Sequence, residues 1–235
     1  MGRFQHYLQL SLGDIRKNYK VYLPVLIIKL FFVFLGCTLL GVGISLYFLG
    51  GAGASPIAVW VDGLHNLLDI SYGQAAMLNS ACFFLFLLFF SRKYIWLGSL
   101  VSIVWTGLVI DYSFTWLQPL LPAVPSLWEG VGIAFLGLFA TCLGTGITMA
   151  AEQCTDPFVG CILTVSASIH KSQRFVYLAS IAILLAAGFC FGGVIGFGTL
   201  VGVVGTAPLS GGIYRLLQKC TRVLQRPFLK GGADS

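Results

Sequence analysis

The sequence predicts an all-α integral membrane protein of about six transmembrane helices, arranged as two inverted three-helix repeats that each include a short proline-started half-helix. Three observations support this expectation: the composition, a series of long apolar runs, and a similarity between the two halves of the chain. Of the 235 residues, 57% are hydrophobic and 9% are charged, whereas globular domains carry about 25% charged residues. A soluble fold could not hide so much apolar surface, so lipid has to surround much of the chain.

The charge balance indicates a membrane surface rather than a nucleic-acid partner. Fourteen Lys and Arg residues outnumber eight Asp and Glu residues, which gives a formal net charge of +6. The cations lie in short segments between apolar runs and in the two tails, as they do on the cytoplasmic side of membrane proteins. We therefore expect an inner-membrane protein with cytoplasmic N- and C-termini. Its expected partners are the lipid bilayer and a small solute, and both a monomer and a homo-oligomer fit the sequence.

Four regions follow from the distribution of apolar residues. They are a cytoplasmic amphipathic N-terminal segment (1–22), a first membrane repeat (23–118), a second membrane repeat (129–217) and a basic cytoplasmic tail (218–235). A helix of about 20 apolar residues spans a bilayer, and the expected spans are 25–48, 73–90, 94–117, 131–150, 175–193 and 196–217. The stretches 56–70 and 157–169 are shorter and more polar, and the sequence leaves open whether they cross or are re-entrant.

The second half of the chain matches the first half at a nearly constant spacing. The matches occur in the same order at an offset of 100 or 101 residues, and they pair 34–36 with 135–137, 54–56 with 155–157, and 97–106 with 197–206. Ordered matches at one spacing predict a duplication.

The cations favour inverted rather than parallel halves. If the two short stretches do not cross, each half has three spans, and the second half is inverted relative to the first. All cations then lie on or near the cytoplasmic side, including Arg92 and Lys93. The alternative has eight crossings in two parallel halves, and it places Arg92 and Lys93 outside, against the positive-inside tendency.

The starts of the two short stretches are candidate solute-binding sites. Ser55-Pro56 and Asp156-Pro157 occupy equivalent places, and a polar residue before a proline suits an N-cap and a first helical turn. A helix that begins inside the protein offers N–H groups and the positive end of its dipole to an anion or a polar solute. A capped interfacial helix without a ligand has the same sequence pattern.

A polar helical face adds further candidates. Asp62, Asn66 and Asp69 follow the i, i+4, i+7 spacing, with His65 beside them. We expect Asp62, His65 and Asn66 to contribute to solute binding. Ionisable groups at membrane depth are costly and are therefore functional candidates, whereas at the outer surface they are merely solvated. The candidates for ion or proton coupling are Asp69, Asp111, Glu152 and His170.

The remaining residues indicate packing rather than chemistry. The seven cysteines form no CxxC pair and lie mostly in apolar runs, where cysteine acts as a small hydrophobe. No pattern of a catalytic triad, a metal site or a phosphate loop is present, so we expect neither an enzyme nor a cofactor nor a metal. The glycines expected at close helix contacts are Gly43, Gly98, Gly107, Gly144, Gly196 and Gly198.

Several of these motifs resemble a known family. They are residues 41–45 with 54–56, Gly98-Ser99-Leu100 with Gly107 and Asp111, and residues 196–200 with 206–208. Together they resemble the bacterial multi-pass family labelled YczE/YyaS/YitT over about residues 30–215, and the resemblance implies a bacterial membrane protein. The family often carries an Asp two residues after the proline, where this chain has Ala58 and Val159. That departure implies a shifted substrate or a lost activity.

The leading hypothesis is a transporter or permease of an unidentified small solute. Its binding site would lie between the halves, near Ser55 and Asp156. The alternative is a membrane-embedded regulatory or scaffold protein that acts through its basic tail. The cations of that tail are spaced as a helical stripe formed by Arg215, Lys219, Arg222 and Arg226.

Overall fold

The computed structural model describes residues 19–51, 55–91, 97–121, 127–151, 156–196, 199, 202, 205 and 209–217. Within these ranges every regular element is a helix, which confirms the expected all-α class. The amphipathic segment expected at 1–22 lies outside the described residues except for its last four, which already belong to the first long helix. The basic tail, 218–235, lies outside them entirely.

Five long helices account for the first five expected spans. They are α3 (Tyr19–Gly50), α5 (Tyr72–Phe90), α6 (Leu97–Leu117), α7 (Leu127–Ala151) and α9 (Gln173–Cys190). Within the described part of the chain, these five contain segments that are long and apolar enough to cross a membrane. The sixth expected span, 196–217, is described only in part, and its residues 209–217 are helical. A count of six therefore stays a prediction.

The outer surface of the helices is apolar. Large side chains such as Phe89 and Trp128 are 80% and 82% exposed. Water would disfavour so many exposed aromatic and aliphatic groups, whereas lipid tails accommodate them. The surface therefore agrees with the expected membrane environment.

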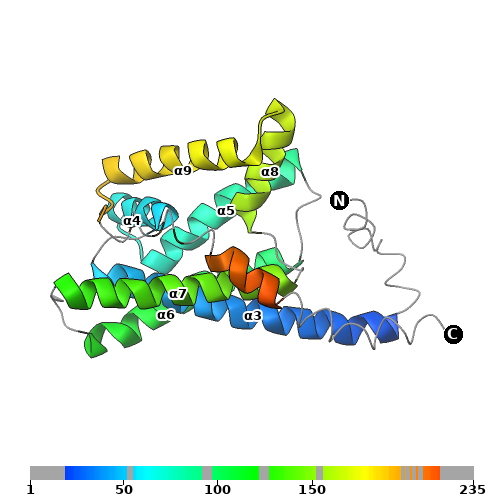
Figure 1. Ribbon diagram of the computed structural model, residues 1–235, viewed down its shortest axis with the longest axis horizontal. Coiled ribbons are helices and arrows are strands. Elements are labelled where there is room, and N and C mark those ends of the chain that lie inside the picture. The colour runs from blue at the N-terminus through cyan, green and yellow to red at the C-terminus, as the bar shows by residue number, and fades with distance from the viewer. Residues whose placement is uncertain are drawn as a thin grey trace.

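Helices α3 and α7 pack against each other in antiparallel orientation, and they lie side by side in Figure 1. A Cβ on Gly43 would lie 2.8 Å from the Gly137 carbonyl oxygen, and a Cβ on Gly137 would lie 2.8 Å from that of Gly43. Gly36 and Gly144 face each other in the same reciprocal way. The early part of each helix thus meets the late part of the other, and glycine permits this close approach.

Two short helices interrupt the series of long ones. Helices α4 (Pro56–Leu68) and α8 (Pro157–Ile169) have 13 residues each, which corresponds to about 20 Å of helix. A hydrocarbon core about 30 Å thick is longer than this. Each helix ends at a residue in the left-handed conformation, Asp69 (φ 52°) or His170 (φ 53°). Each chain segment then turns into the next long helix.

The short helices pack against the long ones (Figure 1). Helix α4 packs on the C-terminal part of α9, where a Cβ on Gly63 would lie 2.7 Å from the Gly188 carbonyl oxygen. Helix α8 packs on α5, with the rings of Phe83 and Phe158 5.3 Å apart. Both short helices therefore have a buried side, unlike a helix that lies freely on a membrane surface.

Candidate functional site

The start of α4 is capped by a neutral side chain. Ser55 precedes Pro56, and its hydroxyl accepts a long hydrogen bond of 3.4 Å from the Ala58 N–H. The Ser55 carbonyl also accepts the Val59 N–H at 2.9 Å, which closes the first helical turn. Pro56 is buried and Ser55 is half-buried. The sequence thus identified the N-cap correctly, and the start of this helix lies within the protein.

The start of α8 is capped by a carboxyl group. Asp156 accepts the Phe158 N–H at 2.8 Å. The surrounding protein raises the pKa of Asp156 by desolvation, against hydrogen bonds from backbone N–H groups. Asp156 itself is accessible at the surface. This exposure reduces the desolvation, but the pKa of Asp156 is still raised.

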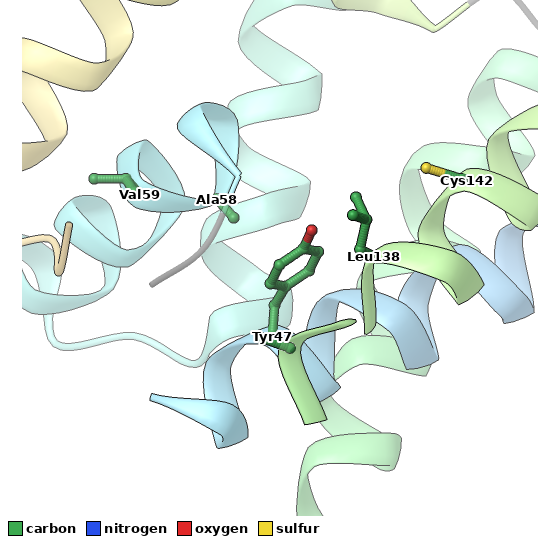
Figure 2. Packing of buried hydrophobic residues seen from close by; sticks show 6 residues of the cluster. Tyr47, Ala58, Val59, Leu138 and Cys142 are labelled. Atoms are coloured by element: carbon green, nitrogen blue, oxygen red, sulfur yellow. The ribbon is translucent and has the colours of Figure 1, made fainter. Parts of the chain in front are cut away.

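A buried tyrosine lies beside the start of α4. Tyr47 of α3 is 2% exposed and belongs to a buried cluster with Ala58, Leu138 and Cys142. In Figure 2 its ring extends from α3, and its hydroxyl ends between Ala58, in the first turn of α4, and Leu138 of α7. This hydroxyl has no hydrogen-bond partner within the described structure. The sequence analysis did not identify Tyr47 as a candidate, because a tyrosine in an apolar run does not reveal whether its hydroxyl is buried or hydrogen-bonded.

A second buried hydroxyl without a partner, that of Thr141, lies elsewhere. It faces the backbone of Gly43, where α7 meets α3. It therefore belongs to the helix–helix contact and not to the start of α4.

The polar face of α4 holds the segment that follows α9. The Asp62 carboxylate accepts the Val194 N–H at 2.8 Å, and the Asn66 amide donates to the Gly192 carbonyl at 3.0 Å. Asp62 is buried at 8% exposure, whereas Asn66 is exposed. Both side chains thus have a structural role, and their role in solute binding stays a prediction.

His65 lies between α4 and α5. Its Nδ1 contacts the Ile70 carbonyl, and its ring stacks on Tyr72 with centroids 4.0 Å apart. Asp69 and His170 end their helices at exposed positions. Of the predicted polar face, Asp62 and Asn66 thus contact the segment after α9, whereas His65 contacts the segment that leads into α5. Asp69 lies at the exposed end of the helix.

Asp111 connects α6 to the start of α5. It accepts the Ser71 hydroxyl at 2.6 Å and the Gly73 N–H at 2.7 Å. A carboxylate at a helix N-terminus is stabilised by the free N–H groups and by the helix dipole. Gly73 has to be small here, because a Cβ would clash with the Gly107 carbonyl oxygen. Asp111 therefore fixes the contact between α5 and α6.

The other predicted residues are partly described. Gly43, Gly107 and Gly144 make the close helix contacts expected of them, and Gly98 is buried at the start of α6. The Gly196 carbonyl accepts the Thr199 N–H at 3.0 Å in a turn. Glu152 and Gly198 lie outside the described residues. The side chains described contain no group of three or more metal-ligand residues.

Long apolar helices, glycine-mediated packing and two short helices define a multi-pass α-helical membrane protein. Residues 27–215 match the family described as a family of unknown function, DUF6198, and the chain belongs to that family.

Two relatives from Bacillus subtilis (strain 168) are similar over most of their length. The uncharacterized membrane protein YczE is 29% identical over 191 residues, which cover 81% of this chain and 85% of the relative. The uncharacterized protein YyaS is 26% identical over 201 residues, which cover 83% and 93%. No solved structure matches the chain. The resemblance inferred from the sequence motifs is thus confirmed.

Proposed function

We propose that the protein is a transporter or permease of a small solute in the bacterial inner membrane, and that it is not an enzyme. One observation carries the proposal: two short helices of equal length start at prolines within the body of a membrane protein. Transporters build midplane sites from interrupted helices, because their free ends offer polar backbone groups in an otherwise apolar interior.

The start of α4 lies beside the long pair formed by α3 and α7. The buried cluster at the start of α4 includes Leu138 and Cys142, which lie near the middle of the span Trp128–Ala151. This placement supports a solute site close to the bilayer midplane.

The antiparallel packing of α3 and α7 supports inverted repeats. Helix α8 begins and ends 101 positions after α4, and the capping serines of α5 and α9, Ser71 and Ser172, have the same spacing. At this spacing α7 is the counterpart of α3. Counterparts that run in opposite directions fit two inverted halves, whereas eight crossings in parallel halves require α3 and α7 to run in the same direction.

Accessibility of the helix starts tests this proposal. Single cysteines at Ser55 and Asp156 would be introduced into a variant without native cysteines and reconstituted in liposomes. We expect each to react with a membrane-impermeant thiol reagent, from the outer side in one conformation and from the inner side in another. Phe135→Cys is the control, because Phe135 is 61% exposed on α7 and faces lipid. If the thiols at 55 and 156 are as unreactive as that control from both sides, the proposal is wrong.

A further inference from the structure

We propose that the start of α4 binds a small, singly charged anion and that the Tyr47 hydroxyl donates a hydrogen bond to it. The inference rests on the proposed function, because it assigns a class of solute to one of the two helix starts. Three observations support it: a buried donor without an acceptor, a difference between the caps of α4 and α8, and the charges of the described side chains.

The Tyr47 hydroxyl is a buried donor that the chain does not satisfy. The residue is 2% exposed, and the described structure provides no partner for its oxygen. Figure 2 places this hydroxyl at the first turn of α4, beside Ala58. Leaving such a group unpaired is costly. An acceptor brought by another molecule, beside the first turn of α4, accounts for it.

The two helix starts differ in what occupies their positive ends. At α8 the chain supplies its own carboxyl oxygen, since Asp156 accepts an N–H at 2.8 Å. At α4 the neutral Ser55 hydroxyl accepts an N–H at 3.4 Å. A helix N-terminus favours negative charge. The α4 start therefore has an uncompensated positive end, and Tyr47 adds a further donor.

The surroundings restrict the charge and size of the ligand. Ala58 and Leu138 flank the Tyr47 hydroxyl in Figure 2, and Cys142 belongs to the same buried apolar cluster. Among the side chains that the structure describes, no Lys or Arg is buried. A divalent anion such as sulfate would lack the cation that usually accompanies it in proteins. One negative charge on a small ion or a short carboxylate matches the helix end and the tyrosine.

Binding to the purified full-length protein tests the inference directly. Wild type, Tyr47→Phe and the control Tyr112→Phe would be titrated with chloride, acetate and sulfate at constant ionic strength, with calorimetry and thermal melting as readouts. Tyr112 is 65% exposed on α6. We expect chloride or acetate to bind, sulfate not to bind, and Tyr47→Phe to weaken binding about tenfold or more, because the bond to a charged acceptor is lost. Tyr112→Phe should match wild type.

The comparison of chloride with acetate identifies whether the anion is inorganic or organic, and either result supports the site. A second variant, Ser55→Asp, puts a carboxylate at the α4 start and should abolish binding by occupying the positive end. Absence of binding for both monovalent probes overturns the inference. So does sulfate binding of equal strength, or affinity that is unchanged in either Tyr47→Phe or Ser55→Asp.

Flux measurements separate this inference from the proposed transport function. Liposomes that contain the protein would be tested for uptake of whichever monovalent probe binds. Binding that depends on Tyr47 without uptake contradicts transport but supports the site. Uptake of another solute by a protein that binds neither probe supports transport and overturns the anion site.

Discussion

Three polar side chains of this largely apolar protein differ in their hydrogen-bond partners: those of Tyr47, Asp62 and Asp156. Asp62 accepts the Val194 N–H across a helix contact, and Asp156 caps the helix that it precedes. Tyr47 has no partner in the described structure. The sequence predicted the cap from the Asp-Pro pair and marked Asp62 by its helical spacing. It could not predict Val194 as a partner, because a main-chain contact 132 positions away leaves no pattern in the residues.

The pKa of Asp156 leads to a prediction at the residue scale. Desolvation by the surrounding protein raises this pKa in the folded protein, so the folded state holds its proton to higher pH than the unfolded state does. Wild-type stability should therefore fall as pH rises above the ordinary Asp value of about 4 and through the raised value. Asp156→Asn removes this ionisation and keeps an effective N-cap. We expect the variant to melt higher than wild type at pH 7, with a difference that shrinks toward pH 4.

Melting in detergent from pH 4 to pH 8 provides the measurement. Asp69→Asn is the control, since Asp69 is exposed and asparagine tolerates its left-handed conformation. A gap between Asp156→Asn and wild type that is constant with pH would contradict the prediction.

At the scale of elements, the sequence predicted helices better than contacts. The first four expected spans are helical in their described parts, and the fifth is helical up to Cys190, three residues before its expected end. The N-caps of α4 and α8 agree with the motifs at Ser55 and Asp156. Apolar runs and capping residues are local sequence patterns, so the sequence alone predicts the helices that they form. The hydrogen bond from Asn66 to the Gly192 carbonyl could not be predicted, because the polar face of α4 has the same sequence whether it contacts water, a solute or the backbone.

The contact between α3 and α7 gives a prediction at this scale. In Gly43→Ala the new Cβ would lie 2.6 Å from the Thr141 nitrogen and 2.8 Å from the Gly137 oxygen. Both are backbone atoms, so the two helices have to separate. We expect a loss of about 1–3 kcal/mol in the free energy of unfolding. Gly132→Ala in α7 is the matched control, because nothing lies within 4 Å of its Cβ position.

Reversible unfolding in mixed micelles measures both variants. Alanine favours helix over glycine by about 1 kcal/mol, so Gly132→Ala should be neutral or slightly stabilising. Equal stability of the two alanine variants would show that α3 and α7 do not approach as closely as described.

At the scale of the whole molecule, two independent properties point to the same topology. One is the distribution of cations in the sequence, and the other is the antiparallel packing of α3 and α7, which close glycine contacts define. An orientation with the N-terminus inside satisfies both if α4 and α8 do not cross. It also puts Lys171 and Arg174, which are exposed near the start of α9, on the cytoplasmic side.

This topology makes a prediction that separates six crossings from eight. In a variant without native cysteines, Arg92→Cys and Lys171→Cys should both react with an impermeant thiol reagent only from the cytoplasmic side. Gln118→Cys, in the short 3₁₀ turn (η2, Gln118–Leu120) after α6, should react only from the outside. Eight crossings in parallel halves would instead place 92 outside and both 118 and 171 inside. Labelling of intact cells and of inverted vesicles distinguishes the two patterns, because positions 92 and 171 share a side only if the short helices turn back within the membrane.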